Sequence, residues 1–146
     1  MKKNFEEFIK EGIIKKITID KEKAKFLVKE AEKDYFYLQK SIDKIGVDNE
    51  TANNHIKLCY DLIMELIRAK LSSVGFSSSG QGAHEAEITY LKVLGFKEAD
   101  VDFADKIRYF RNGMLYYGTI LDKDYAEKVI DFTKRMYNKL KELSSE

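Results

Sequence analysis

The chain contains no proline and no tryptophan, and only one of its 146 residues, Cys59, is a cysteine. Proline is the strongest helix breaker, so its absence favours long, uninterrupted helices. A single cysteine excludes a disulfide within one chain and suits a reducing compartment, so we expect a cytoplasmic protein. No apolar run is long enough to span a bilayer and residues 1–20 carry no signal-peptide pattern, so we expect no membrane association.

The net charge of the chain is also low. Charged residues make up 35% of the chain and hydrophobic ones 44%, which is typical of a folded globular domain, yet the formal net charge is only +1. A surface that is neutral overall does not attract nucleic acid at long range, so any contact with nucleic acid needs local clustering or two paired chains. Only four residues are arginines, and two of them, Arg108 and Arg111, lie in one short segment.

Apolar residues recur at steps of three and four along nearly the whole chain, which predicts helices. We expect a single domain over 1–146, built as an all-α, antiparallel up-and-down bundle of about five to six helices. Residues 1–20 should form a short helix and a connector, and 75–82 a loop rich in glycine and serine. The segment "KKITID" at 15–20 is the only candidate strand. Longer helices are predicted over 21–45, about 50–74, 83–94, 99–118 and from about 122 onward.

The predicted helix over 50–74 is apolar around most of its girth, so it should be central to the bundle or lie at a subunit contact. Asp61 and Glu65 sit in its narrow polar line and need partners if they are buried. Arg68, Arg108 or Arg111 could supply the opposite charge, and a solvated edge is the alternative interpretation.

The segment "IRYFRNGMLYYG" at 107–118 displays two different faces on a helical wheel. At about 100° per residue, Arg111 falls on the flank, and Arg108, Asn112 and Tyr116 fall opposite the core line. Arginine and tyrosine are favoured at protein interfaces and nucleic-acid sites. In the alternative interpretation the tyrosines cover neighbouring helices and Arg108 pairs with Asp105 or Asp61. The core line itself is predicted to hold Phe103, Ile107, Phe110, Met114 and Tyr117.

This segment, the preceding helix "HIKLCYDLIMELIRAKLSSVGF", the small-residue loop and "AHEAEITYLKVLGF" together resemble the HEPN family (higher eukaryotes and prokaryotes nucleotide-binding). The resemblance runs from about residue 21 onward. It implies a helical bundle that dimerises, with an Arg, a polar residue and a His of a late helix lining a cleft between the two copies. In catalytic members that composite site cleaves RNA without a metal.

Carried over onto this chain, the resemblance makes Arg111 the motif arginine and Asn112 the polar residue after it. The motif His should fall at 116–118, where this sequence has Tyr116, Tyr117 and Gly118. Tyrosine, with a pKa of about 10, is a poor base at neutral pH, whereas histidine, with a pKa of about 6.5, exchanges protons readily. The site is therefore better equipped to bind a phosphate than to cut RNA.

Two functions are consistent with these residues, and a structural dimer without a ligand is a third hypothesis. In the first, a homodimer binds RNA or a nucleotide, with Arg108, Arg111 and Tyr117 as binding residues. If it cleaves RNA, Arg111, Asn112 and Tyr116 are the catalytic residues. In the second, the chain is a non-catalytic interaction module that accompanies a minimal nucleotidyltransferase, as HEPN proteins often do. Neither function calls for a cofactor or a metal.

Three other residues, His55, Cys59 and His84, are functional candidates. His55 and Cys59 have the spacing of two metal ligands on one helix face, but no further cysteine or helix-borne histidine completes a site, so structural roles are favoured. His84 follows the glycine-rich loop at the start of a predicted helix. It could act as a base at a cleft, or simply cap or pack against that helix.

Overall fold

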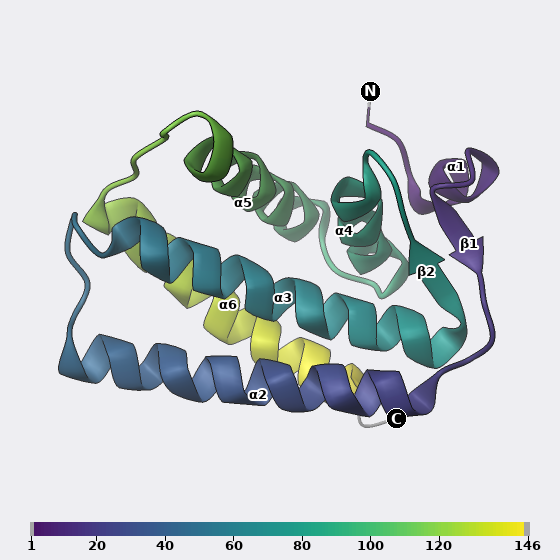
Figure 1. The fold of residues 1–146 in the computed structure, drawn as a ribbon, viewed down its shortest axis with the longest axis horizontal. Helices are drawn as coiled ribbons and strands as arrows, with labels where there is room; N and C mark the ends of the chain where they lie inside the picture. The colour runs from purple at the N-terminus through teal and green to yellow at the C-terminus, as the bar shows by residue number, and fades with distance from the viewer. Residues whose placement is uncertain (1, 145–146) are drawn as a thin grey trace.

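The computed structural model describes residues 2–144, and within that range the chain forms six helices and two short strands (Figure 1). The chain direction alternates through the four long helices, which gives an up-and-down bundle (Figure 1). The predicted all-α fold is confirmed. No helix within the described range is long and apolar enough to cross a membrane. In chain order the elements are α1 (Phe5–Lys10), β1 (Ile14–Lys16), α2 (Lys21–Lys44), α3 (Ala52–Val74), β2 (Phe76–Ser78), α4 (Ala83–Val93), α5 (Glu98–Tyr116) and α6 (Lys123–Ser144).

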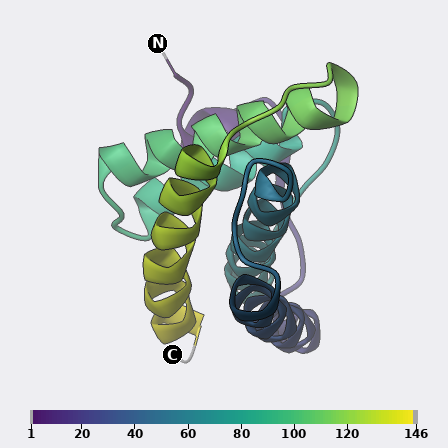
Figure 2. The same ribbon diagram turned by 90° about the vertical axis from the view of Figure 1, so that its left-hand side faces the viewer.

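Helix α3 is the centre of the bundle, as its apolar sequence predicts. It packs against α2, α4, α5 and α6. Figures 1 and 2 show α4 and α5 on one side of α3 and α2 on the opposite side. A helix with neighbours on several sides buries apolar residues around most of its girth, which is the main stabilising contribution in such a bundle. The residues of α3 with no exposed surface include Ile56, Leu62, Leu66 and Ile67.

A small antiparallel sheet joins the N-terminal segment to the end of α3. Ile14 lies opposite Ser78 in this sheet, so β2 occupies part of the segment 75–82 that was expected to be a loop throughout. Gly75 makes the turn from α3 into β2 at a φ of 87°, and a Cβ there would come within 2.8 Å of the Ile17 carbonyl oxygen. Glycine is therefore required at this close approach.

Asn53 at the start of α3 holds the connection between α5 and α6. Its side-chain amide donates to the Thr119 carbonyl at 2.9 Å, and its carbonyl oxygen accepts from the Leu121 N–H at 3.0 Å. The chain passes so close to α5 here that a Cβ at Gly113 would collide with the Thr119 side chain. These contacts fix where α5 ends, and hence where the tyrosines at its C-terminus point.

Candidate functional site

Three of the four arginines lie around the side chain of Tyr60. Arg68 is on α3, and Arg108 and Arg111 are on α5. The guanidinium carbon of Arg111 is 5.2 Å from the centre of the Tyr60 ring. Burial raises the pKa of Tyr60 to about 12, and the positive charges of all three arginines oppose that rise. We call Arg68, Arg108, Arg111, Tyr60 and His84 the arginine cluster.

Arg111 lies on the flank of α5, where the helical wheel placed it. Ala104 and Ile107 anchor the same helix in the core, so the Arg111 side chain is directed toward α3 and only 23% of it is exposed. One of its terminal nitrogens is 3.5 Å from Oδ1 of Asp61. Its Nε is buried and finds no hydrogen-bond acceptor among the described residues. Arg111 therefore keeps donor capacity that the fold does not use.

The other two arginines are held by carboxylates. Arg108 Nε is 2.7 Å from Oδ1 of Asp105, one turn earlier on α5, which is the pairing foreseen in the alternative interpretation. Arg68 binds both oxygens of Glu87, at 2.7 and 3.2 Å. Glu87 is itself buried, so this bidentate ion pair fixes the orientation of the Arg68 guanidinium.

His84, in the first turn of α4, completes the cluster. Its Nδ1 lies 3.2 Å from the Tyr60 hydroxyl, which leaves Nε2 as the second polar atom of the ring. Burial and the positive charges of Arg68, Arg111 and Arg108 lower the pKa of His84 below its usual value, and the nearby Glu87 carboxylate opposes this shift. The imidazole is therefore neutral at pH 7 and can accept a proton.

All three predicted catalytic residues lie on α5, and within the described range no hydrogen bond or ion pair joins Arg111 or Asn112 to Tyr116. Asn112 is half-buried next to Arg111, and no hydrogen bond of its side chain is found among the described residues. Tyr116 is 74% exposed at the end of α5. Tyr117 is 85% exposed, so its predicted place in the core line is wrong. The helix ends at Tyr116, and the backbone of Tyr117 leaves helical geometry with a φ of −128°.

The two acids in the polar line of α3 have different surroundings. Asp61 pairs with Arg111, as the sequence suggested. Glu65 has no such partner, and its Oε1 is buried without a hydrogen bond within residues 2–144. Burial and the neighbouring Asp34, which shares a hydrogen bond with it, raise the pKa of Glu65 to about 9. Glu65 therefore stays protonated at neutral pH and adds no negative charge beside the arginines.

His55 and Cys59 serve the core. The two ring nitrogens of His55 lie 3.3 Å from the Ser41 hydroxyl and 2.9 Å from the Thr51 carbonyl oxygen. Cys59 is buried against Thr133, and burial raises the pKa of its thiol to about 12. In the described part of the chain no group of three or more His, Cys, Asp or Glu side chains is arranged to hold a metal ion.

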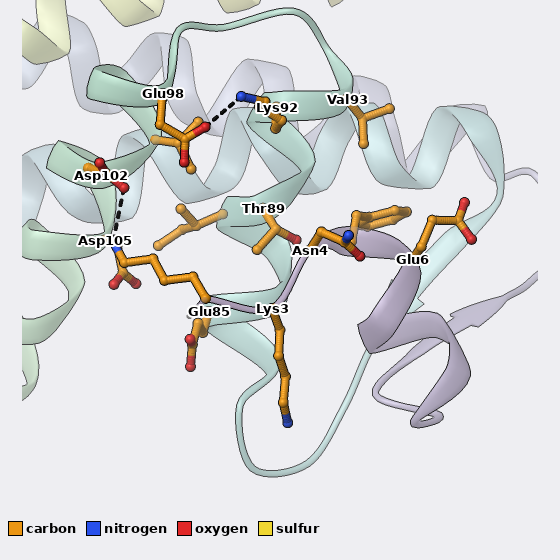
Figure 3. Close-up of a pocket in the computed structure, with 14 residues that line it drawn as sticks. Lys3, Asn4, Glu6, Glu85, Thr89, Lys92, Val93, Glu98, Asp102 and Asp105 are labelled. Carbon is orange, nitrogen blue, oxygen red and sulfur yellow. Dashed lines mark hydrogen bonds and ion pairs between the residues drawn. The ribbon is translucent and has the colours of Figure 1, made fainter.

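A separate hollow of about 330 Å³ lies on the other side of α4 (Figure 3). Its rim is formed largely by charges that neutralise each other. Lys92 reaches Glu98 at 2.5 Å, and Lys2 reaches Asp102 at 2.9 Å. The remaining carboxylates on the rim would repel a phosphate, so we place no part of an anion site there. The floor of the hollow is apolar and includes Phe5, Ile88 and Val101.

Sequence reasoning did not place Tyr60, Arg68 and His84 beside Arg111. Tyr60 fell in an apolar stripe of α3, and no spacing within one helix reveals that a residue faces an arginine of another helix.

In comparisons with known proteins, no family model, no curated protein and no solved structure matches this chain. Chemically, the arginine cluster can bind an anion through its guanidinium groups and exchange a proton through His84.

Proposed function

We propose that this chain binds RNA or a nucleotide through the arginine cluster, as one half of a homodimeric site. The observation that carries the proposal is the gathering of Arg68, Arg108 and Arg111 on a chain that has only four arginines. Guanidinium groups present forked donors that match phosphate oxygens and keep their charge at every physiological pH. Each of these arginines also contacts a carboxylate of the chain, so a bound phosphate would engage the guanidinium donors that those ion pairs leave free.

The dimer part of the proposal rests on the HEPN resemblance and on the exposed end of α5. A twofold axis near this end would set two arginine clusters facing one cleft and double a local positive charge that is weak in one chain. It would also bring Tyr116 of one copy toward Arg111 and Asn112 of the other. The apolar and aromatic residues available to cover such a contact are Tyr109, Leu115, Tyr116, Tyr117 and Ile120.

If the site cleaves RNA, we propose His84 as the proton acceptor in place of Tyr116. A neutral imidazole can take the proton of a ribose 2′-hydroxyl at pH 7, whereas an exposed tyrosine does so poorly. Arg111 would stabilise the negative charge that develops on the phosphorus oxygens, and Asn112 would orient the phosphate. Tyr116 and Tyr117 would then act in binding, by stacking on bases.

Fluorescence anisotropy with a labelled single-stranded RNA, in buffer containing EDTA, tests the binding. We expect Arg111→Gln and Arg108→Gln each to weaken binding about tenfold, the loss expected for one charge-assisted hydrogen bond. Arg135→Gln is the matched control, since Arg135 pairs with Asp100 away from the cluster. Equal affinities of all three variants and the parent would exclude this site. Circular dichroism confirms that each variant is folded.

RNA cleavage is scored in the same samples by gel electrophoresis. The mechanism predicts that His84→Ala abolishes any metal-independent cleavage and that Tyr116→Phe retains it. Cleavage lost in Tyr116→Phe and kept in His84→Ala would reverse the two roles.

The second candidate function is a protein-interaction module for a minimal nucleotidyltransferase. The exposed aromatic residues at the end of α5 favour it, because aromatic side chains are enriched at protein interfaces. The test is co-purification of a nucleotidyltransferase with the chain and with two sets of variants. Loss of the partner with Tyr109→Ser and Tyr116→Ser, but not with Arg111→Gln, would support this function over the first.

A further inference from the structure

A polar cavity of about 350 Å³ adjoins the arginine cluster and shares Arg68 and His84 with it. The cavity is built from four elements. Lys23 comes from the first turn of α2, Arg68 and Ser72 from α3, and His84 from the first turn of α4. The strand β2, which the sequence did not predict, forms another wall, and the polar residues that it contributes are Ser77 and Ser78.

The charges around this cavity favour an anion. Glu87 is the one carboxylate among the residues that line it, and Glu87 is already bound by Arg68 through both oxygens. Lys23 makes no ion pair within the described part of the chain, so its ammonium group is available to a ligand. One unpaired cation beside an oriented guanidinium attracts a small anion more than a neutral molecule.

The hydrogen-bonding groups around the cavity suit the oxygens of a phosphate. Serine hydroxyls and backbone N–H groups of β2 can donate to them, and so can the Nε2 position of His84 when it carries a proton. Helix α4 begins at the cavity wall, and its N-cap residue, Gly82, offers no side-chain cap to the first turn. The N–H groups of Ala83 and Ala86 are bonded to backbone carbonyls, so the N–H groups of His84 and Glu85 are the ones that add a weak positive end to a site that the side chains already define.

We infer that this cavity binds a phosphate monoester, the terminal phosphate of the RNA or nucleotide held by the arginine cluster. The inference rests on the proposed function for the identity of the molecule that carries the phosphate. Binding of the phosphate group itself does not depend on the proposed function. A terminal phosphate has three free oxygens, enough for Lys23, Arg68 and the serines to engage at once, whereas an internal phosphodiester has two. The neighbouring arginines would hold the rest of the ligand.

Two measurements with Lys23→Gln and its matched control test the inference. Lys25→Gln is the control, because Lys25 lies two residues away on the same exposed helix end, outside the cavity, near Glu22. In the first measurement inorganic phosphate is titrated into the protein and backbone amides are followed by NMR. We expect saturable shifts at Ser77, Ser78 and His84 in the parent and in Lys25→Gln, and a loss of affinity of about tenfold in Lys23→Gln.

The second measurement compares a short RNA that carries a terminal phosphate with the same RNA ending in hydroxyls. We expect the phosphorylated RNA to bind about tenfold more tightly, and Lys23→Gln to remove that preference while the hydroxyl-ended RNA binds as before. Phosphate shifts spread over the surface, or a preference equal in all three proteins, would overturn the inference and leave the proposed function intact. Phosphate binding at Ser77 and Ser78 without any RNA binding would instead support the cavity and reject the proposed function.

Discussion

The Tyr60 hydroxyl and Nδ1 of His84 lie 3.2 Å apart, and they tie the middle of α3 to the first turn of α4. This contact holds the imidazole next to the guanidinium groups of Arg68, Arg108 and Arg111, whose charges act on both rings. A histidine in such surroundings gains its proton at a lower pH than a free histidine does. The pKa of His84 therefore depends on the charges of the nearby arginines.

The first prediction concerns that ionisation. Positive charges disfavour the imidazolium ion, so replacing Arg108 and Arg111 together by Gln should raise the pKa of His84 toward its usual value. An NMR pH titration of the imidazole carbon-bound protons measures the pKa in both proteins. Arg135→Gln should leave it unchanged, because Arg135 pairs with Asp100 and is not among the charges that act on His84. A pKa of His84 that does not move in the double variant would show that the arginines do not act on it.

The second prediction concerns the protonated Glu65. Its pKa rises from 4.5 in the unfolded chain to about 9 in the fold, so the folded state binds the extra proton between these values. Stability from this proton is complete below the lower pKa and is lost as pH rises toward the upper one. Glu65→Gln keeps a neutral side chain at every pH. Its free energy of unfolding should therefore exceed that of the parent near pH 9 and be similar to it near pH 4.5.

Urea denaturation across that pH range measures the effect, with Asp43→Asn on the exposed part of α2 as the control. Parallel stability curves for the parent and Glu65→Gln would show that Glu65 ionises as it does in water.

The third prediction concerns Gly113. Alanine in place of glycine inside a helix usually stabilises by about 1 kcal/mol. At this position the added methyl group would collide with Thr119, so we expect Gly113→Ala to destabilise the fold by about 1–3 kcal/mol. Denaturation of the two proteins measures the difference. In a Thr119→Gly background the space is free, and the same change should then stabilise. A stabilising effect in the parent background would contradict the close packing seen here.

The fourth prediction concerns Cys59. Thiolates react with alkylating reagents and thiols do not, and burial raises the pKa of Cys59 to about 12. Iodoacetamide should therefore leave the folded protein unmodified near pH 8 and modify it at once in concentrated urea. Mass spectrometry gives the fraction modified. Equal rates in both solutions would mean that α3 opens readily at Cys59.

Helix positions followed from the sequence because burying one face of a helix requires apolar residues every three or four positions. That rule placed Ile107 in the core and Arg111 on the flank of α5. It failed at Tyr117, since the helix ends one residue earlier and the chain turns toward Asn53. The strand β2 was missed because "FSS" has no alternating apolar pattern and becomes a strand only by pairing with β1.

By itself the sequence determined an all-α chain with a central apolar helix, a scarcity of arginines and an Arg-Asn pair on a late helix. The tertiary structure alone decided that Arg68, Tyr60 and His84 face Arg108 and Arg111, and that β2 closes a cavity beside them. The reason is physical. Spacing within a helix sets which residues share a face, whereas the packing of whole helices against one another sets which faces meet.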